Sequence, residues 1–131
     1  NGKRVVAFVL SKVGYPYSQD YRDTGNYFDC SSLAYYAWKQ AGVSLLYGGA
    51  NTAASEGQLC YDNNYLVEYE NMEPGDLIFY SYSKNGRFLN ISHVAVYVGD
   101  GMVVEAANEK TGVVYRSIQG KSKIVMIGRP R

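Results

Sequence analysis

The sequence offers one histidine, His93, and two cysteines for thiol–imidazole chemistry. Cys30 lies in the segment FDCSSL, at the start of a predicted helix, and His93 lies far downstream in the segment ISHVAVYVG. A cysteine that can meet a histidine only in space is typical of a thiol nucleophile and its general base. Free backbone N–H groups and the helix dipole favour thiolate over thiol at a helix N-terminus. We therefore expect Cys30 to be the nucleophile and His93 its base.

Both residues also have plainer interpretations. A lone cysteine is commonly a small buried apolar side chain, and a histidine at the start of an apolar strand can be satisfied by backbone hydrogen bonds. A disulfide between Cys60 and Cys30 would silence the nucleophile. Because two cysteines do not make a disulfide framework, we expect Cys60 to be free.

A catalytic imidazole needs a third group to orient it, and strand parity offers Glu105. If residues 99–101 form a three-residue loop, Glu105 lies opposite Ala95, on the face of the sheet that His93 uses. A two-residue turn at positions 100 and 101 would instead put Glu105 on the opposite face. The alternative is that Glu105 is an ordinary surface carboxylate.

The elements that must position these side chains can be predicted from periodicity. Helical spacing indicates helices over residues 3–13, 30–41 and 52–59, with Asp29 capping the second and Gly42 ending it. Strand-like patterns follow at residues 77–82, 93–98, 102–107, 113–117 and 124–127. N-terminal helices followed by an antiparallel sheet of about five strands indicate a two-layer α+β domain.

Composition bounds the possible functions. The length of 131 residues predicts one domain, residues 1–131, and because the chain begins at Asn1 we expect it to be excised from a longer precursor. A net charge of +1 gives no electrostatic basis for binding nucleic acid or an anionic membrane. No apolar run has the length of a membrane span. One histidine and two distant cysteines form no metal site, and no phosphate loop or nucleotide fingerprint indicates a cofactor.

Three segments resemble the motifs of the NlpC/P60 cell-wall peptidases, in the same order and spacing. They are DCSSL at 29–33, PGDLIF at 74–79 and SHVAVYVGDG at 92–101. The resemblance runs from about residue 14 to residue 130. It implies a papain-like α+β fold and hydrolysis of amide bonds in peptidoglycan stem peptides. The usual target in that family is the bond between γ-D-glutamate and a diamino acid, either diaminopimelate or lysine.

The resemblance also implies roles for individual residues. Cys30 would attack the carbonyl, and His93 would take its proton and return it to the leaving amine. The family places a polar residue twelve positions after the histidine, commonly His, Asn or Gln, and here that position holds Glu105. Tyr17, in a segment similar to the family's Gly-x-Pro-Tyr, would donate a hydrogen bond to the oxyanion or substrate. It could equally be a packed loop tyrosine.

By the same resemblance, Asp29 and Ser31 would line the peptide-binding groove, although Asp29 could be a helix cap alone. Two departures limit the comparison. The family's Cys-Ser-Gly has Ser32 at its third position, which places a side chain where close backbone packing is expected. A polar loop, residues 18–22, replaces the usual glycine pair and should border the cleft, which leaves substrate preference open.

We expect a cysteine endopeptidase of peptidoglycan that needs no cofactor. We expect it to be secreted, extracellular or wall-associated in a bacterium, as a monomeric catalytic domain whose wall-binding or lysozyme-like domains lie elsewhere. One alternative is a CHAP-type N-acetylmuramoyl-L-alanine amidase, since those proteins also place Glu and Asn after the histidine, as Glu105 and Asn108 stand here. The other is a wall-binding domain without turnover.

Overall fold

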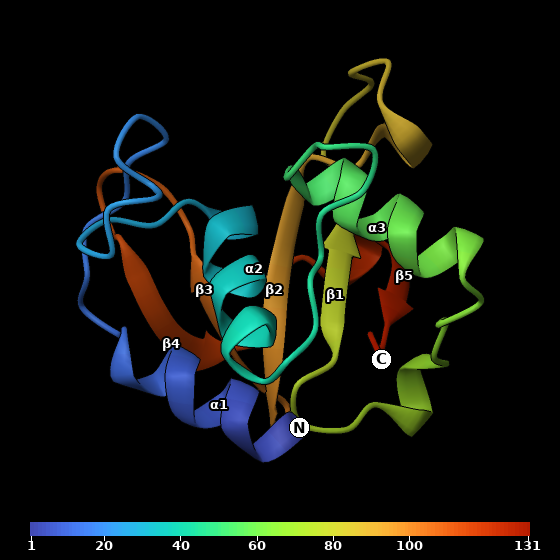
Figure 1. The fold of residues 1–131 in the computed structure, drawn as a ribbon. Helices are drawn as coiled ribbons and strands as arrows, with labels where there is room; N and C mark the ends of the chain where they lie inside the picture. Colours follow the sequence, from blue (N-terminus) through green and yellow to red (C-terminus); the bar gives the residue numbers. More distant parts are fainter.

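The computed structural model describes all 131 residues, and it contains three α-helices and one five-stranded antiparallel sheet. The sheet has the strand order β4-β3-β2-β1-β5, and the three helices lie against one face of it (Figure 1). The predicted α+β architecture is therefore confirmed. None of the helices is long and apolar enough to cross a lipid bilayer. The elements are α1 (Gly2–Ser11), α2 (Cys30–Gln40), α3 (Ala53–Asp62), β1 (Leu77–Tyr80), β2 (His93–Gly99), β3 (Met102–Ala106), β4 (Val113–Ser117) and β5 (Ile124–Gly128), with 3-10 turns η1 (Tyr69–Asn71), η2 (Phe88–Asn90) and η3 (Lys121–Lys123).

The N-terminus of α2 is fixed by a reciprocal capping box. The Asp29 side chain accepts a hydrogen bond from the backbone N–H of Ser32 at 2.8 Å, and the Ser32 hydroxyl accepts one from the backbone N–H of Asp29 at 3.0 Å. This arrangement satisfies two backbone donors at the helix start. It also gives fully buried Ser32 a structural role at the position where the related motif has glycine. Cys30 is consequently held as the first residue of the helix.

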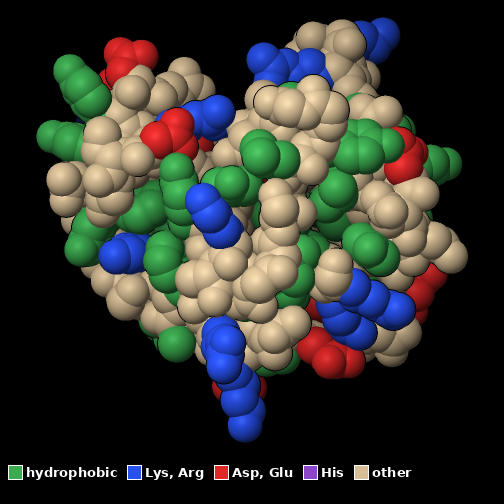
Figure 2. All heavy atoms as spheres, in the orientation of Figure 1, with side chains coloured by type: hydrophobic (Ala, Val, Ile, Leu, Met, Phe, Trp, Pro, Cys, Tyr) green, Lys and Arg blue, Asp and Glu red, His purple; other side chains and the backbone are tan.

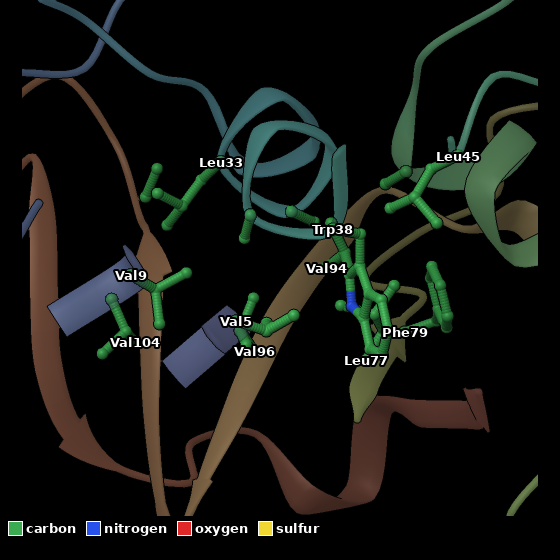
Figure 3. Close-up of a cluster of buried hydrophobic side chains, with 14 of the residues drawn as sticks. Val5, Val9, Leu33, Trp38, Leu45, Leu77, Phe79, Val94, Val96 and Val104 are labelled. Carbon is green, nitrogen blue, oxygen red and sulfur yellow. The ribbon is translucent and has the colours of Figure 1, made fainter. Parts of the chain in front are cut away.

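The main core lies between the helices and the sheet. Apolar side chains from α1, α2 and the central strands converge there, as Figure 3 shows for Val5, Leu33, Trp38, Phe79 and Val96. Burial of these side chains supplies most of the driving force for packing α2 onto β2 and β3. The position of Cys30 relative to the sheet is set by this packing.

A smaller core covers the other face of the sheet. It is formed by Ile78, Tyr80, Ala95, Val103, Ile118 and Ile127. All four residues of β1 are buried because both faces of this strand are covered. The uninterrupted apolar run LIFY in the sequence follows from that double coverage.

The β2–β3 hairpin contains an irregularity that decides which face Glu105 occupies. Gly99 pairs with Met102 across a two-residue turn, yet Val96 pairs with Val104, because the register shifts by one residue between Tyr97 and Gly99. Such a bulge adds one residue to one strand. Continuing the register places Glu105 level with Ala95. The predicted three-residue loop was wrong, but the bulge supplies the extra residue, so the predicted pairing is correct.

The second motif is tied to the end of the chain. Asp76 is buried and accepts hydrogen bonds from Arg129 Nε at 2.8 Å and Nη2 at 2.9 Å, and from the backbone N–H of Glu73 at 2.8 Å. Two parallel bonds between a guanidinium and a carboxylate are geometrically specific and strong. This pair joins the start of β1 to the end of β5.

Several element boundaries differ from those predicted. Helix α1 ends at Ser11, and the backbone turns at Gly14 with a positive φ of 93°. Helix α3 is longer than expected and continues to Asp62, where Asn63 caps it and Asn64 adopts a φ of 60°. Asparagine tolerates this left-handed conformation better than most residues, so it ends a helix as glycine does.

Candidate active site

Cys30, His93 and Glu105 line one cavity of about 260 Å³. Cys30 comes from the N-terminus of α2, His93 is the first residue of β2, and Glu105 lies on β3. The Cys30 and His93 side chains face the same cavity, and each is within range to influence the charge of the other. Three residues from distant parts of the sequence are thus brought together, as parity and spacing predicted.

The imidazole of His93 is oriented by Glu105. Its Nε2 lies 2.6 Å from Glu105 Oε1, and the His93 side chain is only 13% exposed. An imidazole has two ring nitrogens, and the one engaged by the carboxylate fixes the role of the other. With Nε2 bonded to Glu105, Nδ1 is the nitrogen available to Cys30.

Arg116 completes this chain of side chains, and the sequence analysis did not identify it. Its Nε donates to the second Glu105 oxygen, Oε2, at 2.9 Å. Arg116 pairs with Val103 in the β3–β4 register, which makes it a diagonal neighbour of Glu105. Arg116 ends a run of apolar and aromatic residues on β4, a position that is informative only once the β3–β4 register is known.

The electrostatics of the site favour a protonated imidazole. Burial acts to lower the pKa of His93, but its interactions with Cys30 and Glu105 and their negative charges outweigh burial and raise that pKa to about 9. Burial likewise acts to raise the pKa of Glu105, but His93 and Arg116 hold it below its ordinary value. The site can therefore hold imidazolium beside a carboxylate at neutral pH.

Two tyrosine rings flank the imidazole. The ring centroid of buried Tyr80 lies 5.5 Å from that of His93, and Tyr82 stacks on Tyr80 at 5.7 Å. The Tyr80 hydroxyl is buried without a hydrogen-bond partner. These rings limit the access of water to the face of His93, which strengthens the electrostatic interactions of the site.

Tyr17 lies in the same cavity as Cys30. Its backbone forms a parallel bridge with Phe28, which brings the loop alongside the start of α2. Burial raises the pKa of Tyr17, and the negative charges of Cys30 and Asp29 raise it further. The phenol therefore keeps its proton and can donate a hydrogen bond into the cavity.

Asp29 and Ser31 line a second, larger cavity of about 550 Å³ that also includes Cys30. Both side chains are nearly buried, at 5% and 3% exposure. The Nη1 of Arg22 donates to Asp29 Oδ2 and to Ser31 Oγ, both at 3.1 Å. Arg22 therefore lines the cavity beside these two residues, and the sequence analysis missed it because the loop at 18–22 has no periodicity.

Both cysteines are free, so the prediction for Cys60 is confirmed. Cys60 is fully buried in the main core, and burial, followed by the charges of Glu56 and Asp76, raises its pKa to about 12. A buried thiol of this kind is chemically inert. No group of three or more His, Cys, Asp or Glu side chains is placed to hold a metal ion.

The helices, the antiparallel sheet and the position of the cysteine at a helix N-terminus define a papain-like α+β domain. The chain belongs to the NlpC/P60 family, whose sequence profile matches residues 14–126. It is 32% identical over 108 residues to a protein of Listeria grayi named probable endopeptidase p60, a match that covers 82% of this chain and 18% of that protein. The chain thus spans about a fifth of that relative's length.

Solved structures share the fold. NlpC1 from Trichomonas vaginalis superposes with a TM-score of 0.81 at 22% identity, over 98% of this chain and 43% of that one. RipD from Mycobacterium tuberculosis superposes with a TM-score of 0.76 at 24% identity, over 98% and 95% of the two chains. RipD is described as a non-catalytic NlpC/P60 domain protein adapted to peptidoglycan binding. The shared fold therefore does not by itself establish turnover.

Proposed function

We propose that this chain is the catalytic domain of a wall-associated or secreted cysteine endopeptidase that cleaves peptidoglycan stem peptides. The observation that carries the proposal is that Cys30 shares one cavity of an NlpC/P60 domain with His93, whose imidazole is hydrogen-bonded to Glu105. The bond that we assign is the amide between γ-D-glutamate and the diamino acid. Domains outside residues 1–131 would bind the wall.

In the proposed mechanism, the Cys30 thiolate attacks the γ-carbonyl and forms a tetrahedral intermediate. The capping box occupies the backbone N–H groups of Asp29 and Ser32, which leaves those of Cys30 and Ser31 to stabilise the oxyanion. Tyr17 would add a donor from the loop. His93 then protonates the leaving amine, and it later activates the water that hydrolyses the thioester.

The two cavities that share Cys30 would hold different halves of the substrate. His93 lines only the smaller cavity. Because His93 must reach the leaving amine, the diamino acid would occupy the smaller cavity and the glutamyl acyl group the larger one. The scissile bond would then cross the cleft at Cys30.

Product analysis on purified muropeptides tests this proposal. The wild-type domain should release fragments with a new diamino-acid N-terminus, and Cys30→Ala should release none. Cys60→Ser is the matched control, because the Cys60 thiol is buried away from the cleft, and it should cleave the same bond. Activity that survives Cys30→Ala would rule out the mechanism.

The same experiment separates the alternatives. A CHAP-type amidase would release intact stem peptides beginning with L-alanine, and mass spectrometry of the cut bond distinguishes the two. Asn108, which suggested that alternative, has its side-chain oxygen engaged by the backbone N–H groups of Lys110 and Thr111. That engagement favours a role for Asn108 in the loop and supports the endopeptidase assignment. A wall-binding domain without turnover would give no products.

A further inference from the structure

Two arginines line the larger of the two cavities that open at Cys30. Arg22 comes from the loop before α2, and Arg87 comes from the loop between β1 and β2. Figure 2 shows the molecule notched at the upper edge between these two segments, with Lys and Arg side chains on both rims. The larger cavity therefore carries basic groups on both sides.

Arg22 is fixed in place by one nitrogen only. Its Nη1 donates to Asp29 Oδ2, to Ser31 Oγ and, at 2.8 Å, to the backbone carbonyl of Asn51. Nη2 and Nε form no hydrogen bonds, and the side chain is 26% exposed. Arg22 is thus anchored through the two neighbours of Cys30, and its remaining donors are free for a ligand.

The acidic groups around this cavity do not neutralise it. Asp29 directs Oδ1 at the helix cap and Oδ2 at Arg22, so it has no free oxygen directed at the cavity. Glu56 is fully buried and does not line the cavity, and burial, with the charges of Cys30 and Asp29, raises its pKa well above the ordinary value. The guanidinium of Arg87 has no partner at all. Two arginines therefore line this cavity against one carboxylate, Asp29, whose oxygens are already engaged.

We propose that Arg22, assisted by Arg87, binds a substrate carboxylate on the acyl side of the scissile bond and makes the enzyme selective for an unamidated glutamyl residue. The inference rests on the proposed function. A glutamate linked through its γ-carbonyl keeps a free α-carboxylate, which lies roughly 5 Å from the attacked carbon given bonds of about 1.5 Å. Arg22 is hydrogen-bonded to both neighbours of Cys30 and lines the same cavity as its thiol. A guanidinium is also well suited to carboxylate recognition.

A positively charged ligand group is disfavoured in this cavity by the same two arginines. An ammonium group in this cavity would face two guanidinium groups, and the carboxylate that could bind it, Asp29, is already engaged. A carboxamide in place of the carboxylate keeps the shape but loses the charge-assisted hydrogen bonds, which are about twice as strong as neutral ones. Selectivity between carboxylate and carboxamide should therefore depend on Arg22.

The test compares two stem peptides that differ only at this group, L-Ala-γ-D-Glu-diaminopimelate and its D-isoglutamine counterpart. We expect the wild-type domain to cleave the carboxylate peptide with kcat/KM about 10-fold or more above the carboxamide peptide. Arg22→Gln should remove this preference by slowing only the carboxylate peptide. Arg87→Gln should reduce the preference, and Lys84→Gln, which removes a charge from the same loop outside the cavity, should leave it unchanged.

Other outcomes would contradict either the inference about Arg22 or the proposed function, and the two cases can be told apart. Equal cleavage of both peptides by the wild-type domain would refute carboxylate selection and leave the endopeptidase assignment intact. An equal loss on both peptides in Arg22→Gln would mean that Arg22 only holds Asp29 and Ser31. If the wild-type domain cleaves neither peptide, the proposed function itself fails.

Discussion

Glu105 is bonded through both of its oxygens, to His93 Nε2 at 2.6 Å and to Arg116 Nε at 2.9 Å. The carboxylate is 3% exposed, so neither bond is open to competition from bulk water. Because Arg116 fixes the carboxylate and the carboxylate holds Nε2 of the imidazole, Nδ1 is left without a partner in the cavity that Cys30 also lines. The orientation of the His93 ring is thus built into three adjacent strands of the sheet, β2, β3 and β4.

Glu105→Gln should change the pH dependence of activity as well as its size. The pKa of His93 is raised to about 9, so the imidazolium that pairs with a Cys30 thiolate is present below that pH and is lost as the pH rises through it. Removing the carboxylate charge lowers the His93 pKa, so the alkaline limb of kcat/KM should move to lower pH. The loss at neutral pH should be about 10- to 100-fold, the value of one hydrogen bond to a charged group.

A profile of kcat/KM between pH 6 and pH 10 provides this measurement. Glu109→Gln is the matched control, because it removes a carboxylate from an exposed loop position outside the cavity. An unchanged alkaline limb in Glu105→Gln would show that the carboxylate does not set the protonation of the base.

Arg116→Met should lower activity less than Glu105→Gln and shift the pH dependence the opposite way. It removes the donor at Glu105 Oε2 while keeping much of the aliphatic stem, so we expect kcat to fall by roughly 10-fold. Because it also removes a positive charge near the imidazolium, the alkaline limb should move to higher pH. Arg116→Lys should recover part of both changes because it restores the charge. A loss of thermal stability with no change in the pH profile would instead indicate a purely structural role.

The two cysteines should differ sharply in reactivity toward iodoacetamide at neutral pH. Cys30 lies at a helix N-terminus in an open cavity, whereas Cys60 is fully buried and its pKa is raised to about 12. Peptide mapping should find the label on Cys30 in the folded protein and on both cysteines after unfolding. Labelling of Cys60 first, or no labelling of Cys30, would favour a wall-binding domain without turnover.

Arg129→Met should destabilise the fold without altering the chemistry. It leaves the buried Asp76 carboxylate without the guanidinium that donates to both of its oxygens. Removing one partner of a buried ion pair typically costs about 3–5 kcal/mol. Because Arg129 is a third exposed, we expect the lower end of that range in urea unfolding. At urea concentrations below the unfolding transition, the kcat of Arg129→Met should match that of the wild-type domain.

The sequence predicted the elements and the central pair because their signals are local. Asp29 at the start of an apolar helical repeat predicts a capped helix, and the capping box that forms there holds Cys30 on the first turn. His93 begins an apolar strand, and Glu105 could be assigned a face by parity. The role of Ser32 was not foreseen, because its hydroxyl completes the cap in place of the expected glycine.

The hairpin bulge and the two arginines of the site could not be predicted, because they depend on contacts that sequence periodicity does not encode. The bulge between Tyr97 and Gly99 has no sequence signature, so the correct face for Glu105 was predicted with the wrong turn. Arg116 requires the β3–β4 register. Arg22 lies in an irregular loop, and only its packing against Asp29 and Ser31 brings it to the cleft.

The most direct measurement is the capture of the acyl-enzyme. Wild-type domain mixed with L-Ala-γ-D-Glu-diaminopimelate, quenched in acid and digested, should carry the L-Ala-γ-D-Glu acyl group as a thioester on the peptide that contains Cys30. The free diamino acid should appear in the same burst, and Cys30→Ala should give neither. Free diamino acid released by Cys30→Ala at the wild-type rate, or an acyl group found on another residue, would contradict the assignment of Cys30 as nucleophile.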